Sequence, residues 1–382
     1  MPNRQWDIFC TVVDNYGDIG VTWRLARQLV AEHQQTVRLW VDDLAAFARL
    51  CPALQIGADQ QWQQGVEIRH WSADFDDAWQ PGDLVIEAFA CTLPHCAIHA
   101  MRARRPAPLW LNLEYLSAEP WIDDCHGLPS QEQGLRKFFF FPGFTTRSGG
   151  LICEQSLTAE RQAWQANPEQ RNAWLANLGL PAPAARARII SLFTYESAAL
   201  PALLETWQQG PDPVLCLIPH GRSLQALTNW PALQHGQPGD HWQAGALQVM
   251  ILPMTDQPGY DRLLWSCDLN LVRGEDSFLR AQWAAKPFLW HIYPQEAGAH
   301  LEKLQAFLDR YCADLPPALA ANLQRLNLAL NQDDGVAAVA AWQALQADWP
   351  LWQQHAQNWP QQVLAEGDLA SRLVQFGEKW LK

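Results

Sequence analysis

Several features that would place this chain in a common class of protein are missing from its sequence. No run approaches the roughly 18 apolar residues that a membrane-spanning helix needs. Charges at Arg4, Asp7 and Asp14 interrupt the segment in which a signal peptide would be apolar, so we expect a cytoplasmic protein with no membrane partner. Basic side chains number 27 against 40 acidic ones, for a net charge of −13, which argues against a nucleic-acid partner.

Two nucleotide-binding signatures are also absent. No Gly-x-Gly-x-x-Gly follows a predicted strand, and no Gly-x4-Gly-Lys-[Ser/Thr] is present, which argues against dinucleotide-binding and P-loop enzymes. The nine cysteines lack framework spacing, so we expect reduced thiols packed as small apolar groups. Cys91, His95, Cys96 and His99 lie close in sequence, but they lack the paired spacing and the second ligand pair that are typical of zinc sites.

The sequence does contain two series of strand-like apolar runs that alternate with helical stretches. Such alternation is typical of parallel sheets covered by helices, and 382 residues are enough for two domains. The runs are residues 8–13, 36–41, 84–89, 109–113 and 138–141, then 188–193, 214–218, 247–252, 268–272 and 288–292. We therefore predict an α/β protein with Rossmann-like domains over residues 1–180 and 186–360, separated by a proline-containing linker at 179–186. The final helix, at about 361–382, is expected to pack back on the first domain.

The 21 tryptophans are an unusual number for a chain of this length. Most occupy helical positions beside Leu and Ala, as Trp164, Trp174, Trp283 and Trp342 do. We expect them to pack in cores and domain interfaces rather than to stack on a ligand.

The first concentrated chemical signal follows the first predicted strand. Asp14 and Asp18 lie in a short turn with Gly17 and Gly20, directly before a predicted helix. Ligands bind beyond the carboxyl ends of strands in open α/β sheets, and glycines let the backbone approach them closely. Asp18 could instead only cap the helix, but one cap needs one carboxylate and leaves Asp14 unexplained.

The second signal has the same strand-loop-helix form. Arg273 and Gly274 precede Glu275, Asp276 and Ser277 at the expected start of a helix. Arg273 could neutralise a phosphate, while the backbone N–H groups and Ser277 hold a diphosphate and a carboxylate accepts from sugar hydroxyls. The alternative is a helix that Ser277 or Asp276 caps, beside a surface Arg-Glu pair.

Two such loops, one in each half, are typical of an enzyme in which a nucleotide-activated donor binds one domain and an acceptor binds the other. Asp74-Phe-Asp76 matches the short acidic pattern with which metal-dependent glycosyltransferases hold a divalent cation. No strand is expected before it, so we do not favour a metal there.

At these two loops the chain resembles the EarP family, bacterial protein-arginine rhamnosyltransferases that modify translation elongation factor P. The resemblance rests on Trp6-Asp-Ile-Phe-Cys10 and on Val12-Val-Asp14-Asn-Tyr-Gly-Asp18-Ile-Gly20, which continues to residue 27. It also rests on Leu-Phe193-Thr-Tyr195-Glu and, in the second half, on residues 260–278 and 290–296. These strings are long, and they cover both halves.

The resemblance implies a GT-B glycosyltransferase fold, two Rossmann-like domains that face a central cleft. The first domain would bind the acceptor arginine of elongation factor P and the second dTDP-β-L-rhamnose, with inversion at the anomeric carbon and with neither metal nor cofactor. Asp18 is the expected base, Asp14 its partner and Glu275 a further catalytic carboxylate. The expected donor contacts are Asn15, Tyr16, Gly17, Phe193, Tyr195, Gln257, Arg273, Gly274, Glu275, Asp276 and Ser277. Met254 stands where a family aromatic is expected beside the nucleobase.

The chemistry gives the two aspartates a purpose. A free guanidinium has a pKa above about 12 and is a poor nucleophile, so an enzyme must orient it and accept its proton. Asp18 could remove the proton outright or chiefly align the guanidinium.

Two other functions remain open: a GT-B transferase or epimerase for cell-envelope nucleotide sugars, and a binding module without catalysis. The acidic balance and the lack of a basic membrane-facing patch count against the first, and the retention of Asp14, Asp18, Arg273 and Glu275 counts against the second.

Overall fold

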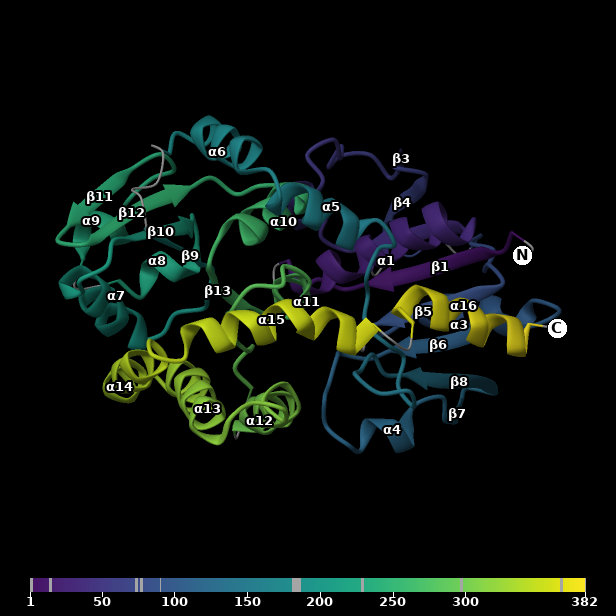
Figure 1. Cartoon of the computed structure of the whole chain (residues 1–382). Helices are drawn as coiled ribbons and strands as arrows, with labels where there is room; N and C mark the ends of the chain where they lie inside the picture. The colour runs from purple at the N-terminus through teal and green to yellow at the C-terminus, as the bar shows by residue number, and fades with distance from the viewer. Residues whose placement is uncertain are drawn as a thin grey trace. The chain divides into compact units, whose positions relative to one another are not determined.

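The computed structural model describes residues 3–13, 16–72, 75, 78–89, 91–180, 187–227, 230–295, 298–364 and 367–381. The chain forms two compact units (Figure 1). Unit 1 comprises Met1–Gln155 and Val363–Lys382, and unit 2 comprises Ser156–Gln362. Each unit is an α/β structure with its own sheet.

Unit 1 is built on an eight-stranded sheet in the order β3-β4-β2-β1-β5-β6-β8-β7. Its strands are β1 (Gln5–Cys10), β2 (Thr36–Val41), β3 (Gln60–Gln63), β4 (Val66–His70), β5 (Leu84–Ala88), β6 (Leu109–Leu113), β7 (Pro129–Glu132) and β8 (Leu135–Phe140). Its helices are α1 (Gly17–His33), α2 (Leu44–Leu50), α3 (His95–Ala103), α4 (Ile122–Cys125) and α16 (Leu369–Trp380). The edge strands β3 and β7 are antiparallel to their neighbours, and all other pairs are parallel.

Unit 2 is built on a six-stranded sheet in the order β11-β12-β10-β9-β13-β14, with only β11 antiparallel among its described strands. Its strands are β9 (Arg188–Leu192), β10 (Val214–Pro219), β11 (His241–Ala244), β12 (Leu247–Leu252), β13 (Leu269–Arg273) and β14 (Phe288–His291). The helices of this part of the chain are α5 (Leu157–Gln165), α6 (Pro168–Asn177), α7 (Ala199–Gln209), α8 (Arg222–Gln225), α9 (Pro231–Gln234), α10 (Gln257–Ser266), α11 (Asp276–Trp283), α12 (Ala299–Tyr311), α13 (Pro317–Asn331), α14 (Gly335–Leu345) and α15 (Trp349–Leu364).

The parallel strands of both units follow the doubly wound order. Numbered along the chain, β4, β2, β1, β5, β6 and β8 give the order 3-2-1-4-5-6, and β12, β10, β9, β13 and β14 give 3-2-1-4-5. The order reverses between β1 and β5 in unit 1, and between β9 and β13 in unit 2. Ligands of such sheets bind beyond the strand ends at this reversal. The two loops singled out in the sequence follow β1 and β13, so both begin at a reversal point.

Each of the ten predicted apolar runs coincides with a strand of these sheets. The strands that the sequence did not reveal are β3, β4, β7 and β11, of which three are short edge strands with few apolar residues. The hairpins β3-β4 and β7-β8 turn through Gln64-Gly65 and Gln133-Gly134, whose φ angles are all positive. Positive φ at both central residues is the requirement of a tight type I′ turn.

The division into units differs from the expected boundary at the 179–186 linker. Helices α5 and α6 lie before that linker but belong to unit 2. The Arg161 guanidinium donates to the Trp283 carbonyl at 3.1 Å, and Trp164 Nε1 donates to Ser266 Oγ at 3.1 Å. Leu175 of α6 also packs in the apolar core of unit 2. The apolar faces of these two helices therefore complete unit 2, while the proline-containing linker only connects α6 to β9.

The C-terminal helix α16 lies in unit 1 and contacts α1 (Figure 1). The Gln28 amide of α1 donates both to the Cys153 carbonyl at 2.8 Å and to Asp368, which caps α16, at 3.1 Å. Asp368, near the C-terminus, thus helps to stabilise the helix that follows the first candidate loop.

Candidate active site

The loop after β1 is held by backbone N–H groups that donate to two buried or partly buried carboxylates. Val12 N donates to Asp42 Oδ1 at 2.9 Å, and Val13 N donates to Asp18 Oδ2 at 2.9 Å. Asp18 lies in the first turn of α1 and is only 2% exposed. A buried carboxylate needs hydrogen-bond donors, and here the loop itself supplies one.

Asp18 does not cap α1, so the capping interpretation is wrong. The N-cap residue is Tyr16, and it makes no side-chain capping bond. Gly17 begins the helix, and the Gly20 N–H donates to the Tyr16 carbonyl at 2.8 Å. Asp14 and Asn15, both predicted site residues, lie outside the described residues.

A tyrosine that sequence reasoning missed contacts the same carboxylate. Tyr115 follows β6, and its hydroxyl donates to Asp18 Oδ1 at 3.1 Å. Its ring stacks on Phe89, which follows β5, with centroids 4.8 Å apart and planes 25° apart. Because β1, β5 and β6 are parallel neighbours, their carboxyl ends bring these groups to one edge. Tyr115 is about 100 residues from Asp18, and no local pattern could have found it.

In unit 2, Arg273 ends β13 in a buried position, 7% exposed. Its Nη1 donates to the Thr194 carbonyl at 3.2 Å. Its guanidinium carbon lies 4.4 Å from the ring centroid of Phe193 and 5.1 Å from that of Tyr195, both in the loop after β9. The reversal point of this sheet therefore brings together a cation and two aromatic rings, all three of them residues that the resemblance assigns to the donor side.

The loop that carries Arg273 turns sharply at Gly274. Gly274 has a φ of +60°, which favours glycine, and its carbonyl accepts from Trp290 Nε1 at 2.8 Å. Ser277 Oγ accepts from Arg273 N at 3.1 Å and also contacts the Arg273 carbonyl. Ser277, at the start of α11, therefore ties the loop back to the end of β13. The expectation that Ser277 or Asp276 caps α11 is wrong, since Glu275 is the N-cap residue and no side chain caps this helix.

The other donor residues predicted within unit 2 follow the ends of β12 and β13. Gln257 is the first residue of α10 and is 2% exposed, and Glu275 and Asp276 are half-buried at the start of α11. Met254 lies half-buried in the loop between β12 and α10. Tyr260 of α10 packs edge to face against Phe193 at 5.5 Å, and burial raises the pKa of its hydroxyl well above the usual range.

Three further polar residues surround Tyr195 and were missed by sequence reasoning. Arg222 of α8 pairs with Glu196 at 2.8 Å and lies over the Tyr195 ring at 5.2 Å, and this guanidinium lowers the pKa of Glu196. His291 ends β14 and packs edge to face on Tyr195 at 5.4 Å. Burial lowers the pKa of His291 to about 4, so its imidazole is neutral at neutral pH. Arg222 is a neighbour of the predicted residues only in space, whereas Glu196 directly follows Tyr195 in the chain.

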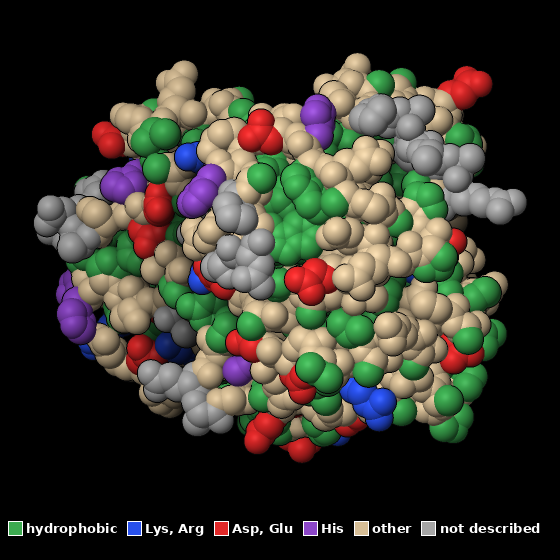
Figure 2. All heavy atoms as spheres, turned by 90° about the vertical axis from the view of Figure 1, so that its left-hand side faces the viewer, with side chains coloured by type: hydrophobic (Ala, Val, Ile, Leu, Met, Phe, Trp, Pro, Cys, Tyr) green, Lys and Arg blue, Asp and Glu red, His purple; other side chains and the backbone are tan. Residues whose placement is uncertain are grey.

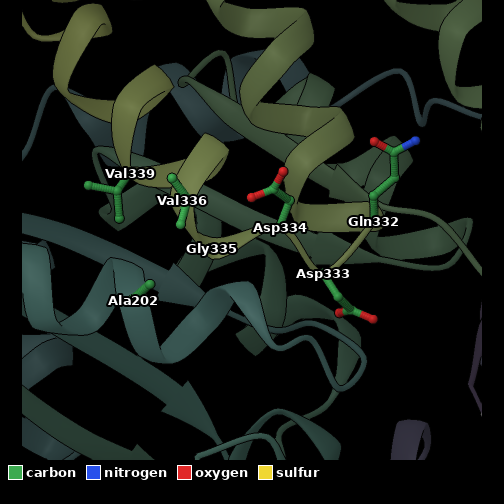
Figure 3. Close-up of a pocket in the computed structure, with 7 residues that line it drawn as sticks. All are labelled: Ala202, Gln332, Asp333, Asp334, Gly335, Val336 and Val339. Carbon is green, nitrogen blue, oxygen red and sulfur yellow. The ribbon is translucent and has the colours of Figure 1, made fainter.

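Two hollows in the surface do not coincide with these loops. One, of about 710 Å³, lies in unit 2 between α7 and the turn before α14 (Figure 3). No cationic side chain lines it, and its two carboxylates serve the local backbone: Asp333 accepts from Ala198 N and Asp334 from Ala337 N, both at 2.9 Å. It does not fit a nucleotide diphosphate.

The other hollow, of about 740 Å³, lies in unit 1 and includes His95, Cys96 and His99 of α3. Cys91, the fourth member of that sequence cluster, is instead buried, and its thiol contacts the Phe9 carbonyl at 3.4 Å. Among the described residues, no group of three or more His, Cys, Asp or Glu side chains could hold a metal ion. Asp74 and Asp76 lie outside the described residues.

The remaining sequence expectations concern thiols, tryptophans, charge and membranes. All nine cysteines are free, and Trp164, Trp283 and Trp342 are buried as expected. On the face drawn in Figure 2, acidic side chains are scattered and basic ones do not gather into a patch. None of the helices in the described part of the chain has the length and apolar character needed to cross a membrane.

Comparison with known proteins identifies the family of this chain. A family model described as "Elongation-Factor P (EF-P) rhamnosyltransferase EarP" matches residues 6–378. The chain belongs to the EarP family. It is 53% identical to the "Protein-arginine rhamnosyltransferase" of Pseudomonas aeruginosa over 99% of this chain and 100% of that protein. The Neisseria meningitidis (serogroup B) protein of the same name is 38% identical over 98% of this chain and 97% of its own length. As a member of the EarP family, the chain is a glycosyltransferase.

Solved structures confirm the fold. The chain matches a structure that concerns "EarP-mediated arginine glycosylation of translation elongation factor EF-P", with a TM-score of 0.71, 38% identity and coverage of 99% and 100% of the two chains. It also matches TcCGT1, solved in complex with UDP, with a TM-score of 0.52, 12% identity and 99% coverage of each chain. The second likeness concerns the fold alone. Membership of the EarP family and the doubly wound units agree with the expected GT-B fold of two Rossmann-like domains.

Proposed function

We propose that this protein transfers L-rhamnose from dTDP-β-L-rhamnose to an arginine side chain of translation elongation factor P, in the cytoplasm. The observation that carries the proposal is the match of the EarP family model to residues 6–378, which includes both candidate loops. Full-length relatives named "Protein-arginine rhamnosyltransferase" support this function over transfer or epimerisation of cell-envelope sugars.

On the acceptor side, Asp18 receives the proton of the acceptor guanidinium. In the reaction a guanidinium nitrogen forms a bond to the anomeric carbon, the bond from that carbon to the diphosphate oxygen breaks, and one proton leaves the guanidinium. The buried position of Asp18 and its two fixed donors, Val13 N and the Tyr115 hydroxyl, hold its carboxylate ready for this proton. Asp14 is the partner that orients the guanidinium.

On the donor side, Arg273 neutralises the charge of the diphosphate as it leaves. The backbone N–H groups at the start of α11 assist it, and neither a metal nor a cofactor is required. The rings of Phe193 and Tyr195 form an apolar wall beside the guanidinium. Glu275 acts on the sugar as a further catalytic carboxylate, while Asn15, Tyr16, Gly17, Gln257, Gly274, Asp276 and Ser277 complete the donor contacts. A single displacement turns the β-linked donor into an α-linked rhamnosyl arginine.

The test of this proposal is the chemistry of the product. The protein is incubated with elongation factor P and, in separate reactions, with dTDP-β-L-rhamnose, dTDP-glucose or UDP-glucose, and the modified peptide is analysed by mass spectrometry and NMR. We expect an α-rhamnosyl group on an arginine with the first donor only. A β linkage, or transfer from a glucose donor at the same rate, would contradict the inverting rhamnosyl transfer.

A further inference from the structure

Tyr115 donates to Asp18, and its ring stacks on Phe89. The two aromatic residues follow the neighbouring strands β6 and β5. We propose that Tyr115, supported by Phe89, is a positioning residue that fixes the carboxylate of Asp18 for the reaction. This inference rests on the proposed function, because it assigns Tyr115 a role through the residue that takes the acceptor proton.

Val13 N and the Tyr115 hydroxyl donate to different oxygens of Asp18. Val13 N donates to Oδ2 at 2.9 Å, and the Tyr115 hydroxyl donates to Oδ1 at 3.1 Å. A single donor would let the carboxylate turn about its terminal bond, whose torsion is broad. Donors on both oxygens fix the plane of the group. The lone pairs that face the acceptor guanidinium then keep one direction, which is a condition for efficient proton transfer.

Tyr115 can serve this purpose only if its own ring is held in place, because its side chain is 36% exposed. Phe89 provides that support. It is 6% exposed, its ring stacks on Tyr115 with centroids 4.8 Å apart, and its N–H donates to the Leu113 carbonyl at 2.7 Å. The stack therefore fixes the tyrosine ring from the apolar side and leaves the hydroxyl on Asp18.

The backbone of Phe89 points to the same role. Its φ is +56°, a left-handed conformation that bulky residues rarely adopt. Such a conformation is costly and persists when the surrounding structure enforces it, often at functional sites. Here it places the Phe89 ring, directly after β5, beneath the residue that follows β6.

The test is a double-mutant cycle with Tyr115→Phe and Asp18→Asn, measured as the kcat and KM for rhamnosylation of elongation factor P by the full chain. Tyr115→Phe keeps the ring and its stack but removes the donor. We expect roughly a tenfold loss of kcat, as for one lost hydrogen bond, with the KM for elongation factor P, the affinity for dTDP-rhamnose and the Tm unchanged. In the Asp18→Asn background the same substitution should have less than a twofold effect, because the group that Tyr115 positions can no longer take a proton.

Tyr311→Phe is the matched control, since Tyr311 is a buried tyrosine of α12 in unit 2, and it should leave kcat unchanged. A Tyr115→Phe variant with wild-type kcat overturns the positioning role, and so does a full tenfold loss that persists in the Asp18→Asn background. The wild-type reaction separates the two claims. If the wild-type protein modifies elongation factor P and Tyr115→Phe does so equally well, only the positioning role fails; an inactive wild-type protein overturns the proposed function and this inference with it.

Discussion

The two candidate loops have the same strand-loop-helix form but opposite chemistry. After β1, a buried carboxylate in the first turn of α1 accepts from the loop and from a tyrosine. After β13, a buried guanidinium at the end of the strand lies against two aromatic rings, and Ser277 closes the loop behind it. A doubly wound sheet therefore fixes where a ligand binds, while the residue types in the loop determine whether the site favours a cation or an anion. The proposed function requires this difference, because it assigns the acceptor arginine to one unit and the donor diphosphate to the other.

The largest expected effect comes from removal of the acidic charge in unit 1. Asp18→Asn keeps the shape of the side chain but cannot take a proton, so we expect transfer to fall on the order of 10²- to 10⁴-fold. The affinity for dTDP-rhamnose, measured by calorimetry, should stay within about twofold, because the donor contacts proposed for unit 2 remain intact. Asp43→Asn is the control: Asp43 caps α2, and asparagine caps equally well. A variant of Asp18 with near-normal turnover would remove it from the acceptor chemistry.

The matching change in unit 2 removes the cation. Arg273→Ala should weaken dTDP-rhamnose binding by about 1–3 kcal/mol, as for a lost charge-assisted contact. Calorimetry on the full chain measures this directly. Arg188→Ala serves as the control, because Arg188 begins β9 and stacks on Trp349 at 3.9 Å, so it tests the loss of a cation elsewhere in unit 2. Equal affinities of wild type and Arg273→Ala would place the diphosphate elsewhere.

The units can also be compared through one histidine each, His291, which is buried, and His126, which is partly buried. Burial lowers the pKa of His291 in unit 2 to about 4, and that of His126 in unit 1 to about 4. A depressed histidine pKa means that the unfolded chain binds the proton more readily. The contribution of each neutral histidine to the free energy of unfolding is therefore fully present above the unfolded pKa of about 6.5. It is lost as the pH falls toward 4.

At about pH 5 the loss should reach about 2 kcal/mol for His291, whose side chain is buried, and less for the partly exposed His126. Thermal unfolding at about pH 7 and about pH 5 measures the effect. His291→Gln should reduce the acid-induced fall in Tm more than His126→Gln does. An identical fall in wild type and His291→Gln would show that His291 does not titrate as a buried neutral group.

The smallest expected effect is that of metal removal. If Arg273 and the helix N-terminus neutralise the diphosphate, activity should be unchanged in excess EDTA. The rate of rhamnosylation with and without EDTA, and with Mg²⁺ added back, is the measurement. A strict requirement for a divalent cation would contradict this part of the account and would make Asp74 and Asp76 candidate metal ligands.

The sequence predicted what depends on local pattern and missed what depends on spatial neighbours. Buried parallel strands such as β1 and β13 appear as apolar runs. Asp18, in the loop region after β1, and Arg273, at the end of β13, could be singled out for that reason. The edge strands β3 and β7 are short and polar, and only their Gln-Gly turns mark them.

The same distinction between local pattern and spatial neighbours applies to the residues of the candidate site. Tyr115 reaches Asp18, and Phe89 reaches Tyr115, because β5 and β6 pair beside β1. Arg222 reaches Tyr195 because β10 pairs with β9. Register and strand order determine these contacts, and neither is encoded in one segment. The unit boundary was misplaced for a related reason: the prolines mark the linker after α6, whereas the packing of Arg161 and Trp164 on unit 2 is a tertiary contact.

The central claim is tested most directly by intact-mass analysis of elongation factor P after incubation with the wild-type protein and dTDP-β-L-rhamnose, followed by peptide mapping. The account predicts the added mass of one rhamnosyl group on one arginine, with no such product from Asp18→Asn on the same timescale. Unmodified elongation factor P, or a rhamnosyl group on a residue other than arginine, would contradict it.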